Sequence, residues 1–179
     1  VGFVSAVSKV QSVLRPGVAN RAYEVLREGV GAPILIQSGF SMEPQAHPAL
    51  IRELAKTGRP VLGVPAPCRT MSDVDELATR FGTALKAAHD DTGERATVVV
   101  HSYGGVISRK YMQENEGYRY ADQLISIGSP HSGMDFFHPL LDKLASKVPI
   151  PGLQSLSASS GPARELNAGL ESFMTDAHA

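Results

Sequence analysis

The residues best suited to chemistry stand where a buried strand meets a helix. Residues 96–100 read Ala-Thr-Val-Val-Val, so a threonine and three valines follow one another without polar alternation. This pattern is typical of a strand buried on both faces of a parallel sheet. His101-Ser102-Tyr103 follows, and a helical segment begins almost at once. A strand that passes into a helix without a loop makes a very tight turn, and Ser102 stands at its apex. The pattern predicts a serine hydroxyl that projects clear of the sheet as a nucleophile.

The residues after the serine fit this geometry. Gly104 and Gly105 let the helix start close to the strand, because neither carries a Cβ. The N–H of Tyr103 would lie at the positive end of that helix. We expect it to stabilise the negative charge that develops on the oxygen of an attacked carbonyl.

This stretch resembles the nucleophile motif of the α/β-hydrolase lipases and esterases, Gly-x-Ser-x-Gly. Here the motif reads Val100-His101-Ser102-Tyr103-Gly104, so valine replaces the first small residue. That is a departure, because the small residue normally permits close packing in the turn. The alternative to a nucleophile elbow is an ordinary Ser/Gly turn between a strand and a helix.

A second buried strand, expected over residues 32–40, ends in Ser38-Gly39-Phe40. In the lipases the corresponding strand ends in His-Gly-x, and the N–H of x is one donor of the oxyanion hole. The resemblance therefore implies that Phe40 N–H is the first donor and Tyr103 N–H the second, with Gly39 beside the site. Serine in place of histidine is a second departure, but the donor is a main-chain group. A plain strand-end glycine is the alternative.

Two downstream stretches also resemble bacterial lipases. Residues 129–133 read Ser-Pro-His-Ser-Gly, similar to the Thr-Pro-His-x-Gly that follows the corresponding family strand. In the family this histidine is a neighbour of the site and not the triad base, which implies the same for His131. Residues 134–160 look like a lid or acyl-groove segment, with an ordinary surface helix as the alternative.

The acid and base of a catalytic triad are missing from their expected place. In this fold they follow the serine after two further strands, and only residues 170–179 remain after Gly169. Asp176 and His178 are too close in sequence to reach Ser102 as an ordered pair. Three explanations stay open: a fragment whose missing part carries the base, a dyad with His131, His138 or His178, or a scaffold without turnover. We expect the first.

The remaining elements alternate along the chain. Helical spacing predicts a helix over residues 47–58 and a longer one over 72–88, capped by Ser72. Strands are expected over 60–65 and 121–130. This order predicts an α/β-hydrolase-like parallel sheet of about four core strands with helices on both faces, truncated or minimal. Residues 1–31 predict an N-terminal helical arm, including a helix over 19–27, ahead of a core over 32–179.

Composition limits the function classes. With 179 residues, 42% of them hydrophobic, the chain predicts one compact domain with a sizeable core. Its net charge of -1 gives no reason to expect a nucleic-acid partner. No stretch reaches the roughly 18 apolar residues of a membrane span. Cys68 has no partner for an internal disulfide, and no signal peptide is visible. Both observations favour the cytoplasm, with secretion as the alternative.

The resemblance implies hydrolysis of carboxylic esters with lipid-like or otherwise apolar acyl groups. Such a reaction needs no metal and no organic cofactor, because a serine, a base and main-chain amides carry it. Thioester hydrolysis on the same site is one alternative. A non-catalytic interaction or regulatory module with the same fold is the other. The sequence predicts no oligomeric state.

Overall fold

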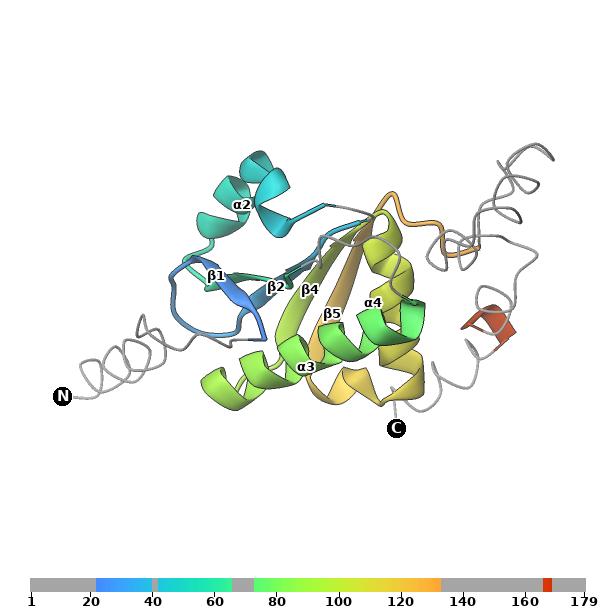
Figure 1. Cartoon of the computed structure of the whole chain (residues 1–179). Helices are drawn as coiled ribbons and strands as arrows, with labels where there is room; N and C mark the ends of the chain where they lie inside the picture. Colours follow the sequence, from blue (N-terminus) through green and yellow to red (C-terminus); the bar gives the residue numbers. More distant parts are fainter. Residues whose placement is uncertain (1–21, 40–41, 66–72, 133–165, 169–179) are drawn as a thin grey trace.

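The computed structural model describes residues 22–39, 42–65, 73–132 and 166–168. Figure 1 shows a twisted central sheet with helices packed beside it. The elements, in chain order, are β1 (Glu24–Arg27), β2 (Ile34–Gln37), η1 (Pro44–Ala46), α2 (Pro48–Ala55), β3 (Val61–Gly63), α3 (Val74–Thr92), β4 (Ala96–His101), α4 (Tyr103–Glu114), η2 (Gly117–Arg119) and β5 (Ala121–Ile127).

Five strands form one sheet in the order β1-β3-β2-β4-β5. Strands β3, β2, β4 and β5 are parallel, so their carboxyl ends meet at one edge of the sheet. In the register of β4 on β5, His101 lies opposite Ile127. The predicted α/β class and the four parallel core strands are confirmed.

The prediction of a helix over residues 19–27 is wrong where the structure describes these residues. Residues 24–27, expected to end a helix, form strand β1, which pairs antiparallel with β3 at the edge of the sheet. Its residues Val25 and Leu26 are half-buried against the core, so pairing with the sheet outweighs the local helical spacing. Residues 1–21 lie outside the described residues, and the division into an arm and a core stays a prediction.

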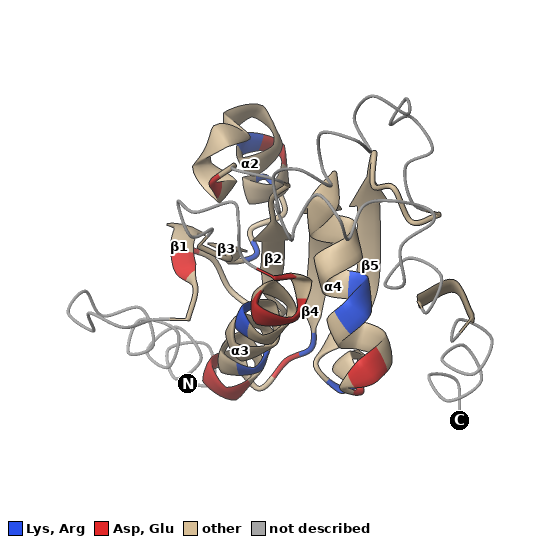
Figure 2. Ribbon diagram, turned by 45° about the vertical axis from the view of Figure 1, so that its right-hand side comes forward, with Lys and Arg blue, Asp and Glu red and all other residues tan. Residues whose placement is uncertain are grey.

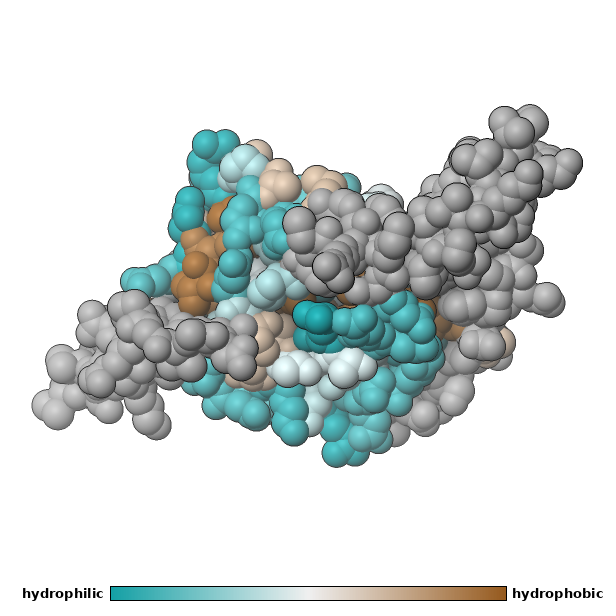
Figure 3. Space-filling model, in the orientation of Figure 1, coloured by the Kyte–Doolittle hydropathy of each residue, from teal (hydrophilic) through white to brown (hydrophobic). Residues whose placement is uncertain are grey.

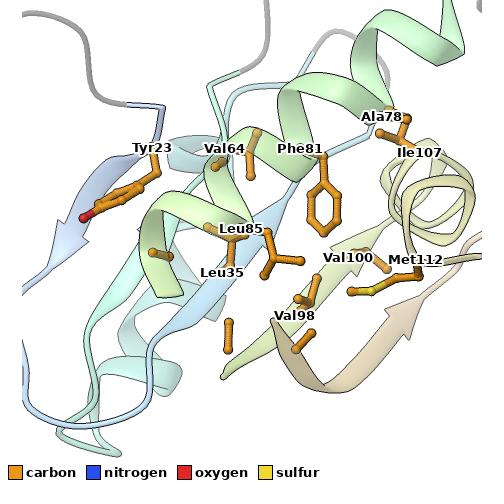
Figure 4. Close-up of a cluster of buried hydrophobic side chains, with 14 of the residues drawn as sticks. Tyr23, Leu35, Val64, Ala78, Phe81, Leu85, Val98, Val100, Ile107 and Met112 are labelled. Atoms are coloured by element: carbon orange, nitrogen blue, oxygen red, sulfur yellow. The ribbon is translucent and has the colours of Figure 1, made fainter. Parts of the chain in front are cut away.

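Helices cover both faces of the sheet, as the strand sequences require. Leu35 of β2 packs in a cluster with residues of α3 and α4, such as Phe81 and Ile107. Its neighbour Ile36 packs on the opposite face with Ile51 of α2. This alternation follows from the two-residue period of a strand. Figure 4 shows the larger cluster, with Phe81 and Leu85 directed at Val98 and Val100 of β4.

The helices begin and end close to the predicted positions. Helix α2 starts at Pro48, which suits a first turn. Helix α3 is capped by Asp73, whose side chain accepts from the N–H of Asp75, instead of by the predicted Ser72. Ser72 and the predicted lid, residues 134–160, lie outside the described residues.

Among the described residues, most charged side chains lie on the outside of this arrangement, and Arg109 is buried. Figure 2 shows them mainly on the helices, and β2, β3 and β4 carry none. The surface seen in Figure 3 is mainly hydrophilic over the described residues. No helix in the described ranges is both long enough and apolar enough to span a membrane.

Candidate active site

Ser102 is the single residue between strand β4 and helix α4. Its backbone has φ 53° and ψ −127°, a region that residues with a Cβ rarely adopt. The N–H of Ser102 donates to Ile127 O across 2.9 Å, and Ser102 O accepts from Gly105 N–H across 3.1 Å. Two hydrogen bonds therefore hold the turn in its unusual conformation. The side chain is half-buried at the carboxyl edge of the sheet.

Two glycines allow the end of β2 to pack against this turn. A Cβ on Gly39 would stand 2.8 Å from Ser102 Cβ and 3.3 Å from its Oγ. A Cβ on Gly104 would stand 2.5 Å from Gln37 O and 2.6 Å from Ser38 O. Separations below 3.0 Å leave no room for a side chain at either position. The structure thus brings Gly39, Gly104 and Ser102 together, as the sequence predicts.

The predicted oxyanion donors are described only in part. Tyr103 is the first residue of α4 and is 2% exposed, so its main chain lies at the positive end of the helix beside Ser102. Phe40 lies outside the described residues, directly after Gly39. The pairing of these two N–H groups around one oxygen stays a prediction.

His101, the residue before Ser102, contacts a second histidine on the α2 side of the sheet. The His101 ring lies edge-on to the ring of His47, the residue before α2, with centroids 4.9 Å apart. Burial, and then the nearby His101, lower the pKa of His47 from its usual 6.5. His47 Nε2 and His101 Nδ1 are both buried without a hydrogen-bond partner.

The loop after β5 lies over the first turn of α4. A Cβ on Gly105 would stand 2.2 Å from Ser129 Oγ and 3.1 Å from His131 Cε1. His131 Nε2 is 2.8 Å from Ser126 Oγ, while its Nδ1 is buried without a partner. Burial, and then the nearby Arg109, lower the pKa of His131. His131 thus lies against the first turn of α4, and its role as a neighbour of the site stays a prediction.

Arg109 ties this loop to a segment much later in the chain. Its guanidinium, on a residue that is 9% exposed, donates to His131 O at 3.1 Å and to Leu166 O at 2.7 Å. Gln113, one turn further along α4, donates to the same Leu166 carbonyl at 3.0 Å. Burial lowers the pKa of Arg109. Residues 166–168 are therefore held against α4, on the face of the sheet that carries α3.

Sequence reasoning did not assign roles to His47, Ser126 or Arg109. No short motif marks them, because they reach the site from separate elements. One signal was available for His47: it follows a parallel strand, and the loops at the carboxyl ends of such strands form the usual site. His89, Asp90 and Asp91 are adjacent on α3, and no group of three or more metal-binding side chains gathers anywhere in the described ranges.

Comparisons with known proteins bear on the fold. No family profile matches the sequence, and no curated protein matches it either. The mature lipase BlEst2 of Bacillus licheniformis superposes with a TM-score of 0.67 at 15% identity, over 86% of this chain and 67% of the lipase chain. Lipase B of Aspergillus fumigatus gives 0.69 at 15% identity, over 87% of this chain and 41% of its own.

A third similar structure is the phospholipase PlaB of Legionella pneumophila, with a TM-score of 0.57 at 19% identity over 78% of this chain and 35% of its own. This chain therefore spans less than half the length of the Aspergillus and Legionella enzymes. At such identities the likeness concerns the arrangement of strands and helices. The parallel sheet, the helices on both of its faces and these superpositions show that the chain has the α/β-hydrolase fold.

Proposed function

We propose that this chain belongs to a serine hydrolase that cleaves carboxylic esters of apolar acyl groups. The observation that carries the proposal is Ser102, held at φ 53° between β4 and α4 with Gly39 packed against its side chain. A strained residue at the edge of a parallel sheet is a mark of function, because the surrounding structure must maintain the strain. The lipases and the phospholipase among the similar structures support the ester class.

The reaction follows the general scheme for a serine nucleophile. Ser102 Oγ attacks the ester carbonyl carbon, and its proton passes to a base. The carbonyl oxygen becomes an oxyanion, which the N–H groups of Phe40 and Tyr103 stabilise. The tetrahedral intermediate collapses, the C–O bond breaks, and the alcohol leaves with the proton from the base. Water then attacks the acyl group on Ser102 by the same steps and releases the carboxylic acid.

The base in this proposal is a histidine from outside the described residues. His131 is the nearest alternative, but its Nε2 is 2.8 Å from Ser126 Oγ, and no hydrogen bond between described residues joins it to Ser102. His131→Gln separates the two possibilities. If His131 is only a neighbour, this variant keeps covalent labelling of Ser102. If it is the base, labelling falls by the factor typical of a lost general base, about 10²–10⁴.

A fluorophosphonate probe tests the proposal directly, because it reacts with an activated serine whatever the natural substrate is. We expect the full-length protein to be labelled and its Ser102→Ala variant not to be labelled. Hydrolysis of p-nitrophenyl esters of increasing acyl length, compared with the matching acyl thioesters, then identifies the bond that is cleaved. A folded full-length protein that remains unlabelled would instead favour a non-catalytic module with this fold.

A further inference from the structure

Arg109 carries a positive charge into the protein interior without a carboxylate to balance it. The residue is buried, and none of the ion pairs among the described residues involves it. Its guanidinium donates instead to three neutral oxygens: Gln113 Oε1 at 3.1 Å, His131 O at 3.1 Å and Leu166 O at 2.7 Å. Burying an unpaired charge costs free energy, which such hydrogen bonds offset only while their geometry holds. The three acceptors are therefore held at fixed places around one planar group.

Gly105, Arg109 and Gln113 form a stripe along one face of α4. Successive members are one helical turn apart, so they lie in line along the helix. The loop after β5 lies over the first two members. A Cβ on Gly105 would stand 2.2 Å from Ser129 Oγ, and His131 O accepts from the Arg109 guanidinium. The stripe is therefore the surface on which α4 holds this loop.

The loop after β5 is closed on itself, and Arg109 joins it to α4. Within the loop, Ser126 Oγ is 2.8 Å from His131 Nε2, and His131 N–H donates to Ser129 O across 3.0 Å. These bonds fix the shape of the loop but not its place on the helix. Among the described residues, the hydrogen bond that ties the loop beyond Ile127 to α4 runs from Arg109 Nη1 to His131 O. The guanidinium thus determines where the loop lies on α4.

The same loop reaches the turn that carries Ser102 at two points. At its start, Ile127 O accepts from Ser102 N–H across 2.9 Å. Further along, Ser129 packs against Gly105, whose own N–H donates to Ser102 O across 3.1 Å. Ser102 keeps φ at 53° only while its surroundings restrain it, because a residue with a Cβ relaxes from that region when it is free to do so. A loop that moved along α4 would loosen both restraints and let the serine move.

We propose that Arg109 is a positioning residue for Ser102. By holding the loop after β5 on the first turn of α4, its guanidinium keeps the serine hydroxyl in the geometry that attack on a carbonyl requires. This inference rests on the proposed function and adds to it a residue about two helical turns further along the chain. Arg109 acts through the loop, by way of Ile127 and Gly105, and not by contact with the reacting atoms.

The rate of fluorophosphonate labelling in the full-length protein tests the proposal. A misplacement of the attacking group by about 1 Å costs on the order of 10²-fold in rate. We expect Arg109→Met to lower the labelling rate at saturating probe by about that factor. The half-saturating probe concentration should stay nearly unchanged, because Arg109 binds no part of the probe. An unchanged rate, with the unmodified protein labelled, would overturn the proposal and leave the proposed function standing.

Arg109→Lys is the conservative variant. It keeps the charge and a donor on a long side chain, but it lacks the planar fork, so it should recover part of the labelling rate. Should the methionine variant not fold, the lysine variant carries the same test with a smaller loss. A lysine variant labelled as fast as the unmodified protein would show that the fork is not needed, and would overturn the proposal.

Arg59→Met is the matched control for stability. Arg59 also donates to two main-chain carbonyls, those of Ala32 at 2.6 Å and Pro33 at 3.3 Å, and to Thr97 Oγ1 at 2.9 Å. These partners lie at the amino ends of β2 and β4, at the opposite edge of the sheet from Ser102. The substitution should destabilise the fold and leave the labelling rate unchanged. An equal loss of labelling would assign the effect to stability and overturn the proposal.

Gln113→Met separates the loop after β5 from residues 166–168. It removes one donor to Leu166 O and leaves the acceptor of the Arg109 bond at His131 O in place. The labelling rate should stay close to that of the unmodified protein. A loss as large as that in Arg109→Met would place the effect in residues 166–168 and contradict the assignment to the loop.

Amide hydrogen exchange follows the Ser102 turn without any reaction, so the two proposals fail separately. In Arg109→Met, the N–H groups of Ser102 and Gly105 should exchange at least about tenfold faster relative to those of Val98 and Val99 in β4, as loss of one charged hydrogen bond provides. A uniform increase over all four amides would reflect global stability alone and overturn the proposal. Selective loosening in a full-length protein that a fluorophosphonate does not label would keep Arg109 as the residue that positions the turn, and would reject the hydrolase.

Discussion

The main-chain N–H of Ser102 donates to the carbonyl of Ile127 across 2.9 Å, so strand β5 fixes the turn that presents the serine. The same turn is bonded from within α4, where Gly105 N–H donates to Ser102 O. A residue with a Cβ keeps φ at 53° only because these bonds and the packing of Gly39 leave no relaxed alternative. The surrounding hydrogen bonds and packing therefore maintain the strained backbone of Ser102.

That strain should be measurable as stability. Ser102→Gly removes the Cβ from a backbone conformation that glycine adopts freely, whereas Ser102→Ala keeps the Cβ. We expect the glycine variant to be more stable than the alanine variant by about 1 kcal/mol, after the extra chain entropy of glycine is subtracted. Urea denaturation of both variants measures the difference. Equal stabilities, or a less stable glycine variant, would show that the turn is not strained.

The close approach of Gly39 gives a second prediction. An alanine at position 39 would place its Cβ 2.8 Å from Ser102 Cβ, and one of the two must move. A displacement of the attacking hydroxyl by about 1 Å costs on the order of 10²-fold in rate. We expect Gly39→Ala to slow fluorophosphonate labelling of Ser102 by about that factor. Circular dichroism checks that the variant is folded, and unchanged labelling would mean that the contact is easily relieved.

Strong periodic patterns made much of the fold predictable. The Ala-Thr-Val-Val-Val run at 96–100 identified β4, and Leu77, Phe81 and Leu85 identified α3 by their helical spacing. Residues 24–27 were assigned to a helix because β1 forms only through pairing with β3, which no local pattern reveals. Long-range pairing is decided by the whole sheet and not by neighbours in sequence.

The candidate site was predictable only where it is local. Ser102 and its glycines lie within a few residues, so their spacing indicated the turn. His47 and His101 are 54 positions apart in the sequence, and the fold brings both to the same edge of the sheet. No spacing rule predicts the edge-on contact of their rings. Arg109 reaches Leu166 across 57 positions, so its role was equally hidden in the sequence.

Two histidines should make stability depend on pH. Burial is the main cause that lowers the pKa of both His47 and His131 from 6.5 in the folded chain. The unfolded chain then binds more protons below that value, so stability is fully present above pH 6.5 and is lost as pH falls through the folded-state pKa values. Replacing both residues, as His47→Phe and His131→Gln, should flatten this dependence. Thermal unfolding of both chains between pH 5 and 7.5 (conditions chosen on either side of about 6.5) measures the change. A dependence as steep as in the unmodified protein would assign it to other groups.

Arg109 gives the sharpest stability prediction, because its bonds all go to neutral oxygens. Arg109→Met leaves His131 O and Leu166 O without this donor at a site where the arginine is 9% exposed. We expect a loss of about 2–3 kcal/mol in the free energy of unfolding, since buried acceptors lose charged donors. Arg109→Lys should recover only part of the lost stability, because an ammonium group lacks the planar fork that reaches two carbonyls.

Arg119→Met is the control. Arg119 pairs with Glu116 on the surface at 2.7 Å, and its substitution should lower the free energy of unfolding by no more than about 0.5 kcal/mol. Equal effects of the two methionine substitutions would mean that Arg109 does not hold the loop after β5 and residues 166–168 to α4.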